Sequence, residues 1–328
     1  MQFKGGQVTA DTCAIFHTAT VVANQALCRE HYRLTLGVES FAPSLPGQFV
    51  HLCPITPPPG AYPSEPVGDG PVGNDRLSNA SRPLLRRAFS IAGLRNAPSG
   101  VHLDVIYRVV GSATRWMESL ADGDSLSCMG PLGNSFPIHE RRPLAWLVAG
   151  GVGLPPMLWL AEALHRAGRN VVAFCGARSA ELLALTLDPN QPPDPDARRA
   201  TPSALEFARH QVPVVISTDD GSLGFSGHVG LALAAYVEAN RTATDDVVLY
   251  TCGPERMMDS VAAFCRARKI ECHVCMGRAM ACGTGMCQSC VVPVRDEADP
   301  EGWRYRLCCT DGPIFDAQRV IWKPVGAI

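Results

Sequence analysis

The stretch LAWLVAGGVGLPPMLWLAEALHRA, residues 144–167, decides the fold of the central part of the chain. Residues 144–149 form a continuous apolar run that ends in glycines, which is typical of a buried strand. Between residues 156 and 167 the apolar side chains recur at helical spacing. A buried strand, a glycine turn and a helix in this order predict a βαβ unit and a parallel sheet covered on both faces.

The same alternation continues downstream to about residue 270. We expect further strands at residues 170–175, 212–217 and 246–251, and helices at residues 229–239 and 256–268. The proline-rich residues 188–202 read as a loop. From Glu271 onward the chain is cysteine-rich and irregular.

Upstream of residue 140 the pattern is strand-like. Short apolar and β-branched runs at residues 19–23, 32–38, 48–53, 88–91, 101–109 and 125–129 are separated by Gly and Pro. About six short strands with little helix predict a small antiparallel barrel. Residues 54–83, dense in Pro, Gly, Ser and Asn, are expected to be a surface loop. The predicted fold class is therefore β plus α/β, with domains at residues 1–140, 141–270 and 271–328.

Composition excludes several classes of function. The 328 residues carry a net charge of −2, so no global basic field attracts nucleic acid or a membrane surface. Residues 1–25 lack the apolar core of a signal peptide, and no apolar run approaches the roughly 20 residues of a membrane span. We expect a cytoplasmic protein.

Eight of the 14 cysteines crowd between Cys265 and Cys309. Cys282-Gly-Thr-Gly-Met-Cys287-Gln-Ser-Cys290, followed by a distant cysteine, has the C-x4-C-x2-C spacing of plant-type [2Fe–2S] proteins. Gly283 and Gly285 let the backbone approach inorganic sulfide closely. Zinc is the competing interpretation, but zinc sites generally use paired C-x2–4-C knuckles. We therefore favour iron–sulfur over zinc.

Spacing leaves the fourth ligand open, because Cys308 and Cys309 are neighbours. Cys272 and Cys275 form a further C-x2-C pair. Two cysteines cannot complete a metal site alone, so we interpret them as free thiols near the cluster. The six cysteines before residue 260 stand singly in apolar segments and are expected to be small buried hydrophobic residues.

Two groups of segments suit a flavin and a dinucleotide. In Arg87-Ala-Phe89-Ser90 the guanidinium can pair with a pyrophosphate, the aromatic ring can pack along the flavin and the hydroxyl can reach its N5. The segment from Gly111 to Thr114 can begin a short helix that receives a phosphate. The glycine turn that follows the strand at residues 144–149, and the end of the last parallel strand, lie where nucleotides bind in such sheets. Their residues are Gly150, Gly151, Gly153, Cys252, Gly253 and Pro254.

Taken in order, these segments resemble the ferredoxin-reductase superfamily, and most of all the electron-transfer subunits of class 1B dihydroorotate dehydrogenases. The resemblance runs from residue 46 to residue 315, and its most specific pieces are residues 130–136 and the ending Cys309-x-Asp-Gly-Pro-x-Phe315. It implies an FAD barrel, an NAD domain and a [2Fe–2S] subdomain. The chain departs from the family pattern at Ala88, Ala113 and Ala149, and none of these changes removes a polar group.

Carried over position by position, the resemblance gives each segment a role. Cys309 becomes the fourth cluster ligand with Cys282, Cys287 and Cys290. Arg87, Phe89, Ser90, Gly111 and Thr114 hold FAD, with Ser90 at N5. The glycines of the 150–153 turn and Cys252, Gly253 and Pro254 line the nicotinamide side, where NAD is the substrate.

The implied function is that of an oxidoreductase subunit that needs no acid, base or nucleophile of its own. The implied partner is an FMN-containing catalytic subunit that oxidises dihydroorotate to orotate in pyrimidine biosynthesis, in a heterotetramer. Two alternatives stay open: a reductase component serving an oxygenase, hydrogenase or sulfide-linked system, and a zinc-bearing interaction protein. NAD is preferred to NADP, although Arg178 leaves a 2′-phosphate possible.

Overall fold

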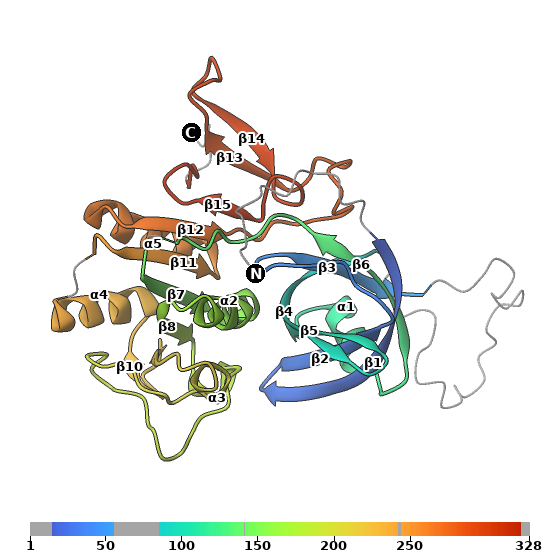
Figure 1. Cartoon of the computed structure of the whole chain (residues 1–328), viewed down its shortest axis with the longest axis horizontal. Coiled ribbons are helices and arrows are strands. Elements are labelled where there is room, and N and C mark those ends of the chain that lie inside the picture. Colours follow the sequence, from blue (N-terminus) through green and yellow to red (C-terminus); the bar gives the residue numbers. More distant parts are fainter. Residues whose placement is uncertain (1–14, 56–84, 141, 242–243, 323–328) are drawn as a thin grey trace, which may run out of the picture.

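The computed structural model of the chain describes residues 15–55, 85–140, 142–241 and 244–322. Figure 1 shows a barrel, a sheet flanked by helices, and a hairpin that projects from the body. The expected fold class is confirmed. The loop predicted at residues 54–83 lies almost entirely outside the described residues.

The barrel is antiparallel and closed, with the strand order β1-β2-β5-β4-β3-β6. Its strands are β1 (Ile15–Cys28), β2 (His31–Val38), β3 (Phe49–Pro54), β4 (Arg87–Ala97), β5 (Gly100–Arg108) and β6 (Ser125–Leu132). All six predicted strands are present, and β1 and β4 extend well beyond the predicted runs. The helix α1 (Ser112–Glu118) places Trp116 and Met117 in the barrel core.

The sheet has seven strands in the order β10-β9-β8-β7-β11-β12-β15. The strands are β7 (Leu144–Gly150), β8 (Asn170–Ala177), β9 (Val214–Thr218), β10 (Phe225–Ser226), β11 (Val247–Cys252), β12 (Glu271–Cys275) and β15 (Ile314–Asp316). All neighbours are parallel except β12 and β15. The loop predicted at residues 188–202 is irregular apart from an isolated bridge between Thr201 and Val214.

The two faces of the sheet pack against different helices. On β7, Trp146 and Val148 face the cluster that contains α4 (Val229–Asn240) and α5 (Glu255–Arg268). The alternate residues, including Leu147, face α2 (Leu154–Arg166) and the short α3 (Leu205–Ala208). Two 3₁₀ turns, η2 (Gly151–Gly153) and η3 (Ala180–Leu182), follow β7 and β8.

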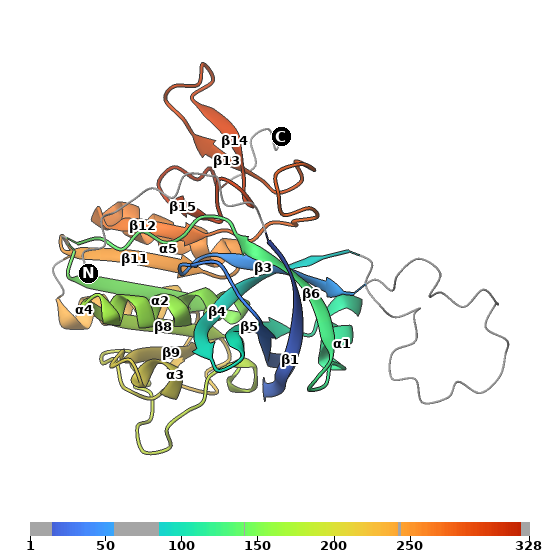
Figure 2. The ribbon, with the colours of Figure 1, turned by 45° about the vertical axis from the view of Figure 1, so that its right-hand side comes forward.

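The helix α2 joins the barrel to the sheet. It lies between them in Figures 1 and 2. Its Leu160 packs in the core of the sheet, whereas Trp159, only 6% exposed, belongs to the core of the barrel. Neighbouring residues on one helix therefore hold the two parts in a defined relation.

The irregular character expected from Glu271 onward is wrong for four segments, which form strands. β12 is hydrogen-bonded to β11, and β15 pairs antiparallel with β12. The alternation of Glu271 and His273 with buried Cys272 and Val274 hides this strand from a search for continuous apolar runs. The remaining strands, β13 (Val291–Arg295) and β14 (Trp303–Leu307), form the projecting hairpin.

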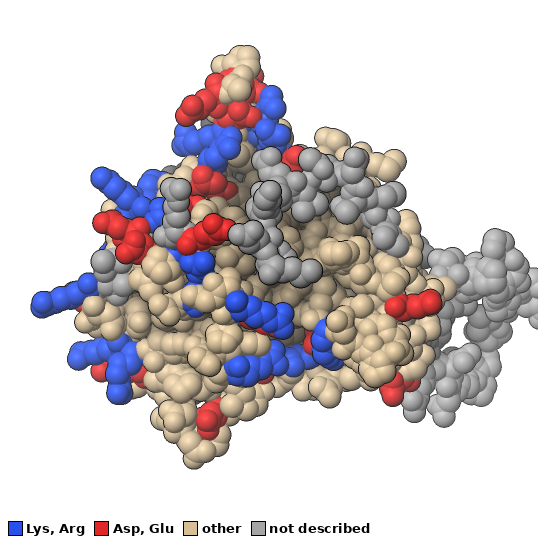
Figure 3. Space-filling view, in the orientation of Figure 1, with Lys and Arg blue, Asp and Glu red and all other residues tan. Residues whose placement is uncertain are grey.

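Charged side chains of both signs are interspersed on the visible face. In Figure 3 they lie over the sheet and the β13–β14 hairpin, and much of the visible barrel face is uncharged. At the hairpin, Arg304 and Arg306 pair with Asp296. Among the described helices, none is long and apolar enough to cross a bilayer.

Candidate functional site

A cavity of about 690 Å³ opens where the barrel meets the carboxyl ends of the parallel strands. Its walls include most of the residues predicted to bind cofactors: Phe89, Ser90, Thr114, Gly150, Gly151, Gly153, Cys252, Gly253 and Pro254. Residues of the barrel and of the sheet, far apart in sequence, thus face one space. This is the position in which open α/β sheets bind nucleotides.

The barrel wall of the cavity is made by β4, β5 and the beginning of α1. Phe89 packs edge-on against Tyr107, with ring centroids 6.3 Å apart, and Ser90 follows it along β4. The hydroxyl of Thr114 accepts hydrogen bonds from the amides of Val110 and Gly111, at 2.9 and 3.2 Å. These bonds fix the first turn of α1 beside the cavity.

Two predicted flavin residues are not among those that line the cavity. Arg87 is exposed at the beginning of β4, and its Nη1 donates to the carbonyl oxygens of Leu85 and Arg86, at 3.1 and 3.2 Å. Gly111 is the N-cap of α1, and open space surrounds the position where a Cβ would stand. The structure therefore does not bring Arg87 together with Phe89 and Ser90 in the cavity.

The sheet wall depends on close contact between two turns. A Cβ on Gly153 would lie 2.0 Å from the carbonyl oxygen of Cys252, so only glycine lets the turn after β7 approach the end of β11. Gly151 has a φ of +52° and no atom within 4 Å of the position of a Cβ, so its backbone is open to the cavity. The close packing at Gly153 and the open backbone at Gly151 together leave room for a phosphate group at the beginning of α2.

Several cavity residues were missed by sequence reasoning: His31, Tyr107, Arg108, Asp219, His228, Met276 and Gly277. Asp219 carries the clearest signal, because it directly follows the buried strand β9 at the carboxyl edge of the sheet. Arg108, by contrast, is paired with Glu30, with Nη2 2.7 Å from Oε2.

Cys272 and Cys275 do not form a metal pair. Positions three apart on a strand face opposite sides, and the two thiols accordingly contact Cys265 and Cys252 respectively. The hydrogen bond with Cys252, together with burial, raises the pKa of Cys275 well above its usual value. Cys272 is a core residue, and the neutral thiol of Cys275 lies in the cavity wall.

The glycine-rich loop folds around the thiol of Cys282. The amides of Thr284 and Cys287 donate to its Sγ, both at 3.4 Å. Although burial opposes the change, these amides lower the pKa of Cys282 to about 6, which favours the thiolate that binds metals. Gly283 and Gly285 have φ values of +75° and +82°, as close approach of the backbone requires.

The four predicted ligands fall into two pairs. The thiols of Cys282 and Cys287 are hydrogen-bonded neighbours, and so are those of Cys290 and Cys309. Burial and the Cys290 thiol raise the pKa of Cys309 to about 12. The thiol of Cys308 instead donates to the carbonyl oxygen of Met276 at 3.0 Å.

This arrangement fits a two-iron cluster better than a single ion. Four thiolates around one zinc, at about 2.3 Å from it, lie within about 3.8 Å of one another. Among the described residues, no three cysteines have all their sulfur atoms within 4.8 Å of one another. Two separate pairs are what two irons require.

His51 provides a second observation in favour of a group at the loop. Its ring is buried, both ring nitrogens lack a hydrogen-bond partner, and a Cβ on Gly283 would lie 2.9 Å from it. Burial, followed by the charge of Arg86, lowers the pKa of His51 to about 4, so the ring is neutral at pH 7. A buried polar ring without a partner, facing the loop, is explained by an acceptor held there.

Comparison with known proteins agrees with this geometry. The family model described as the iron–sulfur cluster binding domain of dihydroorotate dehydrogenase B matches residues 277–321. The dihydroorotate dehydrogenase B (NAD(+)) electron transfer subunit of Geobacillus thermodenitrificans is 30% identical over 308 residues, covering 92% of this chain and 97% of that protein. That of Desulforamulus reducens is 29% identical over 280 residues, or 85% and 88% of the two proteins.

Solved structures share the fold. A structure of an NADH-dependent reduced ferredoxin-NADP oxidoreductase superposes with a TM-score of 0.67 at 23% identity, covering 93% of this chain and 90% of that one. The Amycolatopsis cytochrome P450 reductase GcoB gives a TM-score of 0.53 at 24% identity, with coverage of 78% and 67%. At these identities the likeness concerns the arrangement of barrel and sheet.

Proposed function

Because the chain belongs to the family of dihydroorotate dehydrogenase B (NAD(+)) electron transfer subunits, we propose that it carries electrons from a dihydroorotate-oxidising catalytic subunit to NAD. The chain is an oxidoreductase subunit that uses FAD, a [2Fe–2S] cluster and NAD. When bound, FAD exchanges electron pairs with nicotinamide and single electrons with the cluster. The task of the protein is to position these groups.

One observation carries the proposal. His51 on β3 touches the cluster loop at Gly283, and its register partner on β4, Ala88, lines the cavity. Adjacent strands lie only about 4.8 Å apart. The cluster loop therefore contacts β3, and the cavity begins at the adjacent strand β4. The distance between the two sites along the barrel wall is about one strand spacing, which is short enough for electron transfer.

The residues of the chain act by binding and orientation. Phe89, Ser90 and Thr114 form the barrel wall for the flavin, with Ser90 as the proposed hydrogen-bond partner of N5. Gly151 and the contact between Gly153 and Cys252 shape the opposite wall for the nicotinamide nucleotide. Cys282, Cys287, Cys290 and Cys309 hold the cluster. By cofactor, we propose residues 1–140 for FAD, 141–270 for NAD and 271–328 for the cluster, with β12 and β15 completing the central sheet.

Asp219 supports NAD over NADP. Its carboxylate lies in the cavity at the carboxyl end of β9, where an acidic side chain can accept hydrogen bonds from the hydroxyls of the adenosine ribose. A 2′-phosphate at the same place would be repelled. Arg178 also lines the cavity, and its positive charge instead favours the 2′-phosphate of NADP.

An electron transfer subunit works with a catalytic subunit, which we propose to be an FMN-bearing dihydroorotate dehydrogenase in a cytoplasmic heterotetramer. The cluster loop supports a docking role, because Met286, between two of the ligands, is 84% exposed. A large apolar side chain exposed beside the cluster suits a protein interface.

The test is NAD reduction by dihydroorotate, measured with the cognate catalytic subunit alone and again after addition of this chain. We expect reduction only when both are present. The chain could instead oxidise NADH with artificial acceptors and never couple to dihydroorotate. That result would support the cofactor assignments but contradict the partner, and it would favour the alternative function of a reductase for another system. A colourless protein without flavin or iron would contradict both.

A further inference from the structure

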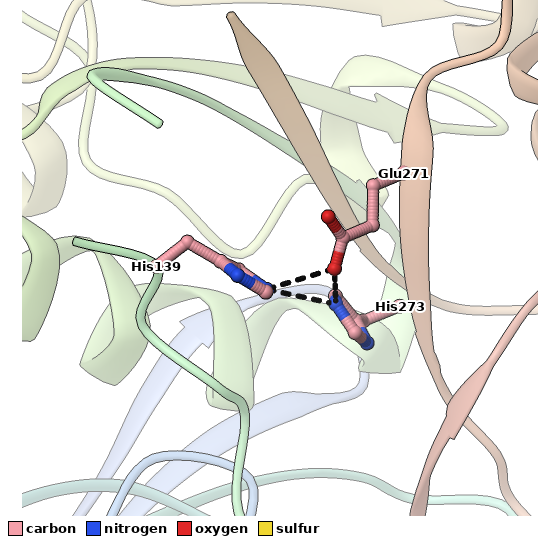
Figure 4. A group of neighbouring side chains, drawn as sticks. All are labelled: His139, Glu271 and His273. Atoms are coloured by element: carbon pink, nitrogen blue, oxygen red, sulfur yellow. Dashed lines mark hydrogen bonds and ion pairs between the residues drawn. The ribbon is translucent and has the colours of Figure 1, made fainter. Parts of the chain in front are cut away.

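Three metal-binding side chains meet on the sheet, away from the four cysteines. His139 lies on the segment between β6 and β7, and Glu271 and His273 lie two residues apart on β12 and so share a face. In Figure 4 the two imidazoles and the carboxylate point toward one another. The Nε2 atoms of the histidines are 3.2 Å apart, and Oε1 of Glu271 is 2.9 Å from His139 and 3.0 Å from His273.

Hydrogen bonds cannot satisfy all three contacts. Each Nε2 carries either one proton or one lone pair, and an ionised carboxylate carries no proton. At most two protons are available for three short contacts. When both are present, the two N–H groups face each other across the 3.2 Å between the rings. A cation at the centre of the triangle accepts a lone pair from all three atoms.

We propose that His139, Glu271 and His273 form a binding site for a divalent cation of the zinc type. Bonds of about 2.0–2.2 Å from imidazole nitrogen and carboxylate oxygen place ligand atoms roughly 3.0–3.5 Å apart, depending on coordination number. The observed separations of 2.9, 3.0 and 3.2 Å lie close to this range. Two imidazoles select Zn²⁺, Co²⁺ or Ni²⁺ rather than Mg²⁺ or Ca²⁺, which prefer oxygen ligands.

The surroundings hold the three side chains in place. Arg142 pairs through Nε with the other carboxylate oxygen of Glu271, at 3.3 Å, and leaves Oε1 to the site. Tyr250 stacks on His273, and its hydroxyl donates to the carbonyl oxygen of Pro137 at 2.7 Å. The segment that carries His139 is therefore attached to the sheet independently of the site. Outer contacts of this kind fix the orientation of metal ligands.

A cation here would tie the connection between barrel and sheet to the strand that leads into the cluster loop. The side chains of His139 and Glu271 are 30% and 33% exposed, so water can reach the site and complete the coordination. The site is a structural clamp, and this inference stands apart from the electron-transfer function.

The test uses the full chain with its flavin and oxidised cluster. Zinc and iron bound after equilibrium dialysis against micromolar Zn²⁺ are measured by mass spectrometry for the wild type, His139→Ala and Glu271→Gln. His102→Ala, which removes an imidazole from the barrel strand β5, is the matched control. We expect one zinc per chain in the wild type and the control, affinity at least 100-fold lower in His139→Ala, and unchanged iron in all.

Zinc K-edge X-ray absorption identifies the ligands. The proposal expects nitrogen and oxygen neighbours with imidazole scattering and no sulfur. Sulfur ligation would assign the zinc to the cysteines and overturn the proposal, and so would equal zinc binding by the wild type and His139→Ala. Because His139 is partly exposed on a connecting segment, its truncation leaves the core intact, and Glu271→Gln provides a near-isosteric second variant.

Discussion

Three of the four proposed cluster ligands lie within the nine residues from Cys282 to Cys290, whereas the cavity draws its walls from residues as distant as His31 and Gly277. The cluster loop is shaped by its own glycines and by amides that surround the Cys282 thiol. The cavity depends on the packing of the barrel against the sheet, in which α2 contributes to the cores of both. Substitutions should therefore affect the two sites separately. Those at the cluster cysteines should abolish cluster binding, and those at the contact between barrel and sheet should weaken flavin binding.

The largest effect is expected at the fourth cluster ligand. Cys309→Ser should reduce iron from about two atoms per chain to nearly none, because the Cys290–Cys309 pair loses a thiolate. Iron analysis and visible absorption measure the loss, and the flavin should stay bound. Cys308→Ser is the matched control, since that thiol points to the carbonyl oxygen of Met276, and it should keep its iron. Loss of iron in the control alone would reverse the assignment.

The docking of barrel and sheet is tested next. Trp159→Ala removes the α2 side chain that lies in the barrel core and should lower the free energy of unfolding by about 3–5 kcal/mol. Flavin affinity should fall, and iron content should be retained. Urea denaturation and flavin titration measure the two effects. Leu231→Ala, at a 51% exposed position on α4, should change stability by less than about 0.5 kcal/mol. Loss of iron in Trp159→Ala would show that the two sites are coupled.

His51, which lies between the two sites, should make the free energy of unfolding depend on pH. Its folded pKa of about 4 lies below the ordinary histidine pKa of 6.5, so the unfolded chain takes up a proton first as pH falls. The contribution of the neutral His51 ring to the free energy of unfolding is complete above pH 6.5 and is lost progressively as the pH falls toward 4. Between pH 7 and 5 the free energy of unfolding should fall by up to about 2 kcal/mol from this group. His51→Phe should remove that part of the slope in urea denaturation, and His102→Phe should keep it.

The smallest effect is expected inside the cavity. Ser90→Ala should slow hydride transfer from NADH to the flavin about tenfold, equivalent to one lost hydrogen bond of about 1.4 kcal/mol. Iron content and stability should be unchanged, and the rate is measured with the flavin site saturated. Single-turnover kinetics measure the rate, with Ser119→Ala at the end of α1 as a control away from the cavity. An unchanged rate would contradict the proposed contact of Ser90 with N5.

Sequence patterns predicted much of this fold for an identifiable reason. The apolar run at residues 144–149 and the helical spacing after it report burial directly, so β7 and α2 were located within about two residues. β12 was missed because Glu271 and His273 interrupt its apolar residues, and their partner His139 comes from a different part of the chain. Polar residues on a strand carry no local sign of what they face.

The sequence by itself determined the composition of the sites: the cysteine spacing, the glycine turns and the Arg-x-Phe-Ser strand. Spacing left Cys308 and Cys309 open and the resemblance favoured Cys309, but only the tertiary structure shows in which direction each such neighbour points. It placed Cys309 beside Cys290 while Cys308 points to Met276, and it put Ser90 but not Arg87 in the cavity wall. The physical reason is that the spacing of residues along the sequence shows which residue types can come together at one site. The direction in which each side chain points depends instead on packing between segments that are distant in sequence.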